Sequence, residues 1–238
     1  MIAGKIDRDK EFDRLAVEQI PICRFHSAML DHELIPASAA GSTRLMIVLH
    51  GLGDSREGYR WLPKAMAMPE LNYLLVDAPD PYGDGFSWYD IYGLPAPGIL
   101  RSRGLLIELL DAQAARGFPT EKTCLFGFSQ GCLMTIESGL RYPKALAALI
   151  GISGYVHEPA ALLRERSPVA NQQKLLVTHG TEDPLIPIGK VREQVRTLQR
   201  EGVNIEWHEL DKAHTIAGME EIDMIRRFVT KCYAKPTR

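Results

Sequence analysis

The sequence predicts an α/β fold in which helices flank a mostly parallel central sheet. Short continuous apolar runs recur along the chain, helical periodicities lie between them, and 238 residues suit one α/β domain. Continuous apolar runs are typical of strands buried on both faces of a parallel sheet. The alternation of strands with helices indicates βαβ units.

Continuous apolar runs predict five buried strands, and each run ends at a polar or glycine-containing turn. A sixth segment, residues 205–208, alternates between apolar and polar side chains, as an edge strand does. The buried strands are residues 45–49, 73–76, 123–126, 147–150 and 175–178. Ligands of such sheets bind beyond the carboxyl ends of the strands. The residues that follow these strands are therefore the candidates for a functional site.

Amphipathic helices are predicted between these strands. In residues 189–200, for example, Val191, Val195 and Leu198 recur at helical spacing and define one apolar face. The other predicted helices are residues 99–116, 129–142 and 218–233. Residues 79–97 break the pattern, because they are rich in glycine, proline and aromatic residues. A loop of this length in a compact domain is typically functional.

We expect residues 1–40 to form an N-terminal extension that packs on a domain of residues 41–238. Mixed charge with a few apolar side chains favours a short helix over residues 5–19. Residues 21–28 and 32–36 are predicted to form a hairpin.

Composition and charge exclude several classes of function. A formal net charge of −2 without a basic cluster argues against nucleic-acid binding. No apolar run is long enough to span a bilayer and no signal peptide is visible, so we expect no integral membrane association. The four cysteines are scattered, which favours free thiols in the reducing cytoplasm. Without metal-ligand spacing or a cofactor motif, neither a metal nor a cofactor is expected.

Residues 127–131 read Gly-Phe-Ser-Gln-Gly and fit the pattern G-x-S-x-G. This pattern lies where a predicted strand ends and a predicted helix begins. A sharp strand-to-helix turn exposes the serine hydroxyl above the sheet, and glycine on both sides tolerates the crowding. Ser129 is therefore the candidate nucleophile. The alternative is a plain turn whose serine caps the helix.

A serine nucleophile needs a histidine base and an acid that orients the base. In folds with this turn, the acid and then the histidine follow the serine along the chain. Asp183 lies in the loop after the fifth buried strand, with Glu182 as its rival. His214 follows the last strand, whereas His208 lies within it. The predicted catalytic residues are Ser129, Asp183 and His214.

An oxyanion that forms on the substrate needs at least two N–H donors. One donor is expected from Gln130, the residue after the nucleophile. The second is expected from residues 50–55, a glycine-rich loop directly after the first buried strand, with Leu52 as the candidate. His50 precedes the serine in the chain, so we interpret it as a loop-shaping residue.

Four segments together resemble a known family. Residues 50–55, 88–91, 127–131 and 179–187 read HGLGDS, WYDI, GFSQG and HGTEDPLIP. In this order they are similar to the phospholipase/carboxylesterase family, which includes bacterial carboxylesterases and acyl-protein thioesterases. The resemblance spans residues 44–232. It implies a compact α/β-hydrolase fold with little or no lid.

The resemblance also implies an activity, namely hydrolysis of short- to medium-chain acyl esters, thioesters or lysophospholipids. It supports the predicted catalytic residues and oxyanion donors. It places Trp88 beside the acyl pocket, together with Phe86, Tyr89 and Ile186. The aromatic side chains of this set favour an apolar acyl pocket. The alternative is that Trp88 only anchors its loop to the core.

The chain departs from the family pattern in three places. Cys132 stands where the family usually has glycine, which predicts crowding at the start of the helix. Ala213 precedes His214 where glycine is usual. Residues 1–40 are longer than the usual N-terminus.

The predicted function is hydrolysis of a small-molecule acyl ester or thioester through an acyl-enzyme, with no cofactor. One alternative is a catalytically inactive binding protein on a hydrolase scaffold. Another is a hydrolase of lactones or peptides, because a fold does not fix a substrate. The sequence leaves a homodimer open.

Overall fold

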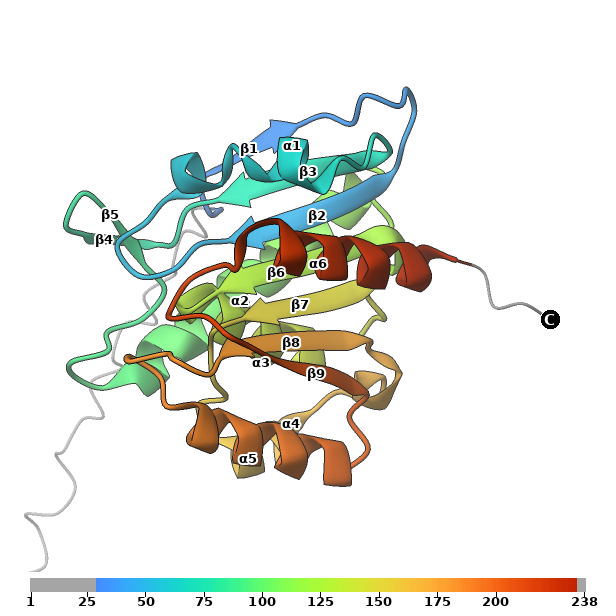
Figure 1. Cartoon of the computed structure of the whole chain (residues 1–238). Helices are drawn as coiled ribbons and strands as arrows, with labels where there is room; N and C mark the ends of the chain where they lie inside the picture. Colours follow the sequence, from blue (N-terminus) through green and yellow to red (C-terminus); the bar gives the residue numbers. More distant parts are fainter. Residues whose placement is uncertain (1–28, 235–238) are drawn as a thin grey trace, which may run out of the picture.

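A seven-stranded sheet in the order β1-β3-β2-β6-β7-β8-β9 forms the centre of the structure (Figure 1). The structure is a computed structural model that describes residues 29–234. The strands of this sheet are β1 (His32–Ile35), β2 (Arg44–Leu49), β3 (Leu71–Val76), β6 (Thr123–Phe128), β7 (Ala148–Ile152), β8 (Leu175–Gly180) and β9 (Ile205–Leu210). All neighbouring strands are parallel except β1, which is antiparallel to β3.

Helices cover both faces of the sheet (Figure 1). The helix α1 packs with α6 on one face, and α2, α3, α4 and α5 lie on the other. Their bounds are α1 (Leu62–Met66), α2 (Pro95–Ala115), α3 (Gln130–Arg141), α4 (Pro159–Glu165), α5 (Ile188–Arg200) and α6 (Gly218–Tyr233). Short 3-10 turns are η1 (Arg56–Tyr59), η2 (Thr120–Lys122) and η3 (Ala170–Gln172). The predicted α/β architecture is confirmed.

The five inner strands are largely apolar because both faces of the sheet are covered. In β2, Leu45 and Ile47 belong to the core beneath α2 and α3, whereas Met46 and Val48 belong to the core beneath α1 and α6. The strand β9 is the edge strand that its alternating sequence predicts.

The segment predicted as a long loop, residues 79–97, is more ordered than expected. It contains an antiparallel hairpin of β4 (Asp80–Tyr82) and β5 (Gly85–Ser87) and the first turn of α2. The helix begins at Pro95, four residues before the prediction, because proline is well suited to the first helical position.

The predicted N-terminal extension lies largely outside the described residues, which begin at residue 29. This applies to the helix over residues 5–19 and to the first strand of the hairpin, residues 21–28. The second strand of that hairpin corresponds to β1, which pairs with β3. The division at residue 40 remains a prediction.

The side chain of Gln173 connects the end of α3 to the sheet, and replacing it is expected to lower the stability of the protein. Its buried side chain accepts a hydrogen bond from the N–H of Leu146 and donates to the carbonyls of Gly139 and Lys144. Gln173→Leu keeps the volume but leaves these groups without partners. The free energy of unfolding should fall by about 1–3 kcal/mol in urea denaturation.

The exposed neighbour Gln172 provides the control for this substitution. Gln172→Leu should change the free energy of unfolding by no more than about 0.5 kcal/mol. Equal stabilities of the two variants would show that the Gln173 contacts contribute nothing.

Candidate active site

Ser129 forms the turn between the end of β6 and the start of α3. Its backbone has φ 54° and ψ −114°, a conformation that residues other than glycine rarely adopt. Glycine is required at positions 127 and 131, because a side chain at either position would clash with the backbone. A Cβ atom on Gly127 would lie 2.0 Å from the carbonyl oxygen of Gly131, and one on Gly131 would lie 2.2 Å from that of Leu49. The chain can turn this sharply only because both positions are glycine.

The structure brings the three predicted catalytic side chains together. Nε2 of His214 lies 2.9 Å from Oγ of Ser129, and Nδ1 of His214 lies 2.7 Å from Oδ2 of Asp183. The aspartate follows β8, and the histidine lies between β9 and α6. In the neutral histidine, Nδ1–H donates to the carboxylate and Nε2 accepts from the serine hydroxyl.

Asp183 is held as a carboxylate by several donors. Its side chain is buried, and Oδ1 accepts hydrogen bonds from the backbone N–H groups of Leu185 and Ile186, each at 2.9 Å. Burial acts to raise the pKa of Asp183, but the bonds from Ile186, His214 and Leu185 outweigh it and hold the pKa below its ordinary value. The rival carboxylate, Glu182, is exposed.

The two predicted oxyanion donors, Leu52 and Gln130, both line the cavity above Ser129. Gln130 is the first residue of α3, so its N–H points out of the helix end. Within residues 29–234, the N–H groups of Leu52 and Gln130 have no hydrogen-bond partner. Both donors are free to bind a negatively charged oxygen.

The side chain of Gln130 fixes the loop that follows β5. Its Oε1 accepts a hydrogen bond from the N–H of Trp88 at 2.9 Å, and its Nε2 donates to the carbonyl of Tyr89 at 2.9 Å. The indole N–H of Trp88 donates to the carbonyl of His50 at 2.9 Å. These bonds connect the loop after β5 to both segments that carry a predicted oxyanion donor.

His50 is buried and bridges two strand ends. Its Nδ1–H donates to the carbonyl of Gly51, and its Nε2 accepts from the N–H of Ala78, which follows β3. Burial lowers the pKa of His50 and keeps the ring neutral. This arrangement agrees with its interpretation as a loop-shaping residue.

A cavity of about 580 Å³ opens over Ser129. Of the four residues predicted to contact substrate, Tyr89 and Ile186 line it, whereas Trp88 and Phe86 do not. Trp88 is fully buried, and Phe86 packs against the core. Trp88 therefore has the contacts of an anchor, which was the alternative interpretation of this residue.

Several further lining residues were not predicted from the sequence. They include Phe128, Tyr155 and Leu185. Tyr155 lies just beyond the end of β7, so the rule that ligands bind beyond strand ends would have found it. The ring of Phe128 lies 5.1 Å from the ring of His214.

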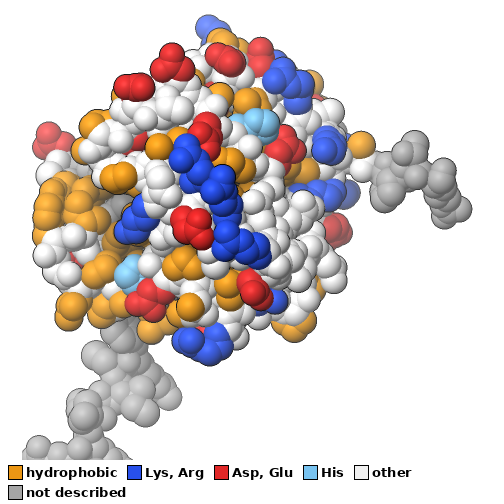
Figure 2. Space-filling view, turned by 60° about the horizontal axis from the view of Figure 1, so that its bottom comes forward, with side chains coloured by type: hydrophobic (Ala, Val, Ile, Leu, Met, Phe, Trp, Pro, Cys, Tyr) orange, Lys and Arg blue, Asp and Glu red, His pale blue; other side chains and the backbone are white. Residues whose placement is uncertain are grey.

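Exposed apolar side chains surround the mouth of the cavity. Ile91, Tyr92 and Leu185 line it and remain exposed, and Leu94 is exposed nearby in sequence. Figure 2 shows hydrophobic side chains gathered at the left edge of the molecule. The loop between β5 and α2 lies on this same side in Figure 1. Such a rim favours a substrate with an apolar part.

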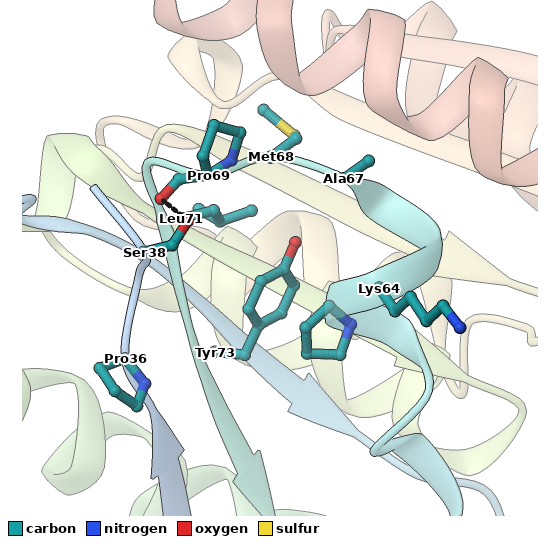
Figure 3. Close-up of a pocket in the computed structure, with 9 residues that line it drawn as sticks. Pro36, Ser38, Lys64, Ala67, Met68, Pro69, Leu71 and Tyr73 are labelled. Carbon is teal, nitrogen blue, oxygen red and sulfur yellow. Dashed lines mark hydrogen bonds between the residues drawn. The ribbon is translucent and has the colours of Figure 1, made fainter.

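A second cavity of about 380 Å³ lies between the start of β3 and α1 (Figure 3). It is lined mainly by apolar side chains, with Lys64 and Ser38 at its edge. Tyr73 lines it, and the hydroxyl of Tyr73 is buried without a hydrogen-bond partner among the described residues. None of the three predicted catalytic residues lines this cavity.

Metal-binding clusters and membrane-spanning helices are both absent from residues 29–234. No group of three or more His, Cys, Asp or Glu side chains in this range could hold a metal ion. None of the helices in this range is long and apolar enough to cross a membrane.

Comparison with known proteins identifies the family of the chain. The model of the phospholipase/carboxylesterase family matches residues 30–233. An acyl-protein thioesterase 1 of Schizosaccharomyces pombe is 36% identical over 174 residues, which cover 68% of this chain and 77% of that protein. An acyl-protein thioesterase 1 of Yarrowia lipolytica is 31% identical over 210 residues, which cover 80% of this chain and 92% of that protein.

Solved structures agree with the sequence relatives. The crystal structure of esterase PE8 superposes with a TM-score of 0.77 at 25% identity, covering 85% of this chain and 99% of that one. The predicted α/β-hydrolase fold is thus confirmed. The chain therefore belongs to the phospholipase/carboxylesterase family of ester and thioester hydrolases.

Proposed function

We propose that the protein is a serine hydrolase of short- to medium-chain acyl esters, thioesters or lysophospholipids, with Ser129 as nucleophile. The hydrogen-bonded chain from Ser129 through His214 to Asp183 carries this proposal. It lies at a cavity with an apolar rim, which suits an acyl chain. The reaction passes through a covalent acyl-enzyme.

Acylation begins when Oγ of Ser129 attacks the carbonyl carbon of the substrate. Nε2 of His214 takes the hydroxyl proton, and Asp183 stabilises the resulting imidazolium. The carbonyl oxygen becomes an oxyanion that accepts hydrogen bonds from the N–H groups of Leu52 and Gln130. When the tetrahedral intermediate collapses, the alcohol or thiol leaves with the proton from Nε2.

Deacylation repeats these steps with water. His214 takes a proton from a water molecule as it attacks the acyl-serine carbonyl, and the same N–H groups stabilise the second oxyanion. Collapse releases the carboxylic acid and returns the proton to Oγ of Ser129. The sequence of steps needs no cofactor.

The residues around the cavity have different roles in this proposal. Tyr89 and Ile186 contact the acyl chain, because both line the cavity. Trp88 and Phe86 hold the loop that carries Tyr89, since Trp88 bonds to His50 and Gln130 and Phe86 packs on the core.

A reducing compartment fits the thiols of the described residues. Cys124, Cys132 and Cys232 are free, and burial raises the pKa of each thiol. A raised pKa keeps a thiol protonated and unreactive. The free state of these thiols is the observation behind the proposed cytoplasmic location, since disulfides are rare in that compartment.

Ser129→Ala should abolish hydrolysis because it removes the nucleophile. We expect kcat/KM for a p-nitrophenyl ester to fall by about 10⁴-fold or more, with loss of labelling by a fluorophosphonate probe. Ser38→Ala, at an exposed serine near the amino end of β3 and away from Ser129, is the control and should keep both signals. If Ser129→Ala kept more than a few per cent of activity, the assignment would be wrong.

The acid of the triad is tested by comparing two neighbouring carboxylates. Asp183→Asn should lower kcat by about 10³–10⁴-fold, because the amide cannot hold His214 in the correct tautomer. Glu182→Gln should leave kcat within about twofold, since Glu182 is exposed. A larger loss from the Glu182 change would identify the other carboxylate as the acid.

The origin of the acyl-chain preference is tested by comparing substitutions at Ile186, which lines the cavity, and at Trp88, which anchors the loop. Ile186→Ala should change the ratio of kcat/KM between medium- and short-chain esters by roughly tenfold at a nearly normal Tm. Trp88→Ala should lower the free energy of unfolding by about 3–5 kcal/mol and change that ratio much less than Ile186→Ala does. The opposite pattern would make Trp88 the pocket wall and Ile186 a structural residue.

A further inference from the structure

We propose that a buried ion pair between Lys212 and Glu221 positions His214 for the reaction with Ser129. The pair lies beneath the loop that carries the histidine and touches neither the serine nor the cavity. Both partners are therefore positioning residues. The inference rests on the proposed function, because it assigns His214 the role of the base.

Glu221 ties three segments together with one carboxylate. Its Oε1 accepts from Nζ of Lys212 at 2.7 Å and from the hydroxyl of Thr178 at 2.5 Å. Its Oε2 accepts from the backbone N–H of Ala217 at 2.6 Å. Glu221 is fully buried, and Lys212 is 6% exposed. The ammonium, hydroxyl and carboxylate groups are thus fixed in the interior, and the bond to Ala217 is partly buried.

These contacts hold both ends of the histidine loop. The loop joins the end of β9 to the start of α6, and His214 lies between Lys212 and Ala217. Within the loop, the backbone hydrogen bonds join residues only two positions apart, such as Thr215 to Ala213. Such short-range bonds do not define a regular structure, so the carboxylate of Glu221 adds a side-chain anchor at both ends of the loop.

The same cluster reaches the segment that carries Asp183. Thr178 belongs to β8, which leads directly into the loop of the aspartate. The backbone carbonyl of Lys212 also accepts a hydrogen bond from the N–H of Glu182 at 3.1 Å. A Cβ atom on Gly180 would lie 2.1 Å from that carbonyl oxygen, so glycine permits the close approach. The acid loop and the histidine loop are therefore joined at Lys212.

Stability alone does not explain a buried lysine at this place. Removing two charges from water costs so much that apolar replacements of a buried pair are often neutral or stabilising. Burial indeed lowers the pKa of Lys212, although Glu221 opposes the shift. Apolar side chains cannot form the directional hydrogen bonds with which this pair holds the ends of the histidine loop.

The expected effect is on kcat. A displacement of about 1 Å of a catalytic group can reduce the rate by about a hundredfold. Lys212→Met removes the donor from one end of the loop at similar side-chain length. We expect kcat to fall by about 10- to 100-fold, with KM within about twofold.

A matched pair at Thr178 separates positioning from packing. Thr178→Val keeps the shape but removes the hydroxyl that binds Glu221, whereas Thr178→Ser keeps the hydroxyl. We expect kcat to fall several-fold in the valine variant and to stay near the wild-type value in the serine variant. This comparison decides the proposal even if Lys212→Met fails to fold.

Ile225→Val is the control for stability, because Ile225 is a buried core residue of α6. It should lower Tm while leaving kcat at the wild-type value. In the double variant Lys212→Met with Glu221→Leu, Tm should exceed that of Lys212→Met, because no unpaired charge remains. Its kcat should stay at the low value of the single variant.

Three results would overturn the inference. They are equal kcat in the two Thr178 variants, wild-type kcat in Lys212→Met, and recovery of kcat together with Tm in the double variant. Each of them leaves a wild-type enzyme that hydrolyses esters and labels at Ser129. A wild-type protein without hydrolysis or labelling would instead refute the proposed function, and the inference with it.

Discussion

The contact between His214 and Ser129 joins residues that are 85 positions apart in the sequence, and the candidate site depends on it. No local structure can create this contact. It exists because β6, β8 and β9 are parallel strands of one sheet, so their carboxyl ends lie at the same edge. Each of the three side chains follows one of these strands, which makes the sheet the scaffold of the site.

Close packing between backbone segments is the second requirement of this arrangement, and glycine meets it. Cys132, which departs from the family pattern, does not force the helix away. Its side chain occupies space left by Gly151 and Gly154, since a Cβ atom on Gly154 would lie 2.4 Å from Cβ of Cys132. The crowding that the sequence predicts at the start of α3 is thus avoided, because β7 and the loop after it have glycine at these two positions.

The parts of the structure that depend on strand order and local pattern could be predicted from the sequence. The buried strands and the turn at Ser129 were predicted because apolar runs and glycine spacing report them directly. Asp183 was predicted from its place in the loop after β8 and from the family resemblance, and the geometry supports it over the exposed Glu182.

Other features depend on contacts between distant segments, which no local pattern records. Trp88 lies in an aromatic loop that could equally line a pocket, and only the structure shows that it is fully buried and bonded to His50 and Gln130. Lys212 and Glu221 look like ordinary surface charges, because such residues are rarely buried. Their pairing becomes visible only when the fold places them against each other.

The central claim is that Ser129 carries the acyl group during the reaction. It is tested most directly by stopping the reaction with acid in its first turnover and mapping the acyl group by peptide mass spectrometry. The proposed mechanism predicts one acyl mass increment on the peptide that contains Ser129, absent when the acyl substrate is left out. Hydrolysis without any acylated peptide, or an acyl group on another residue, would contradict it.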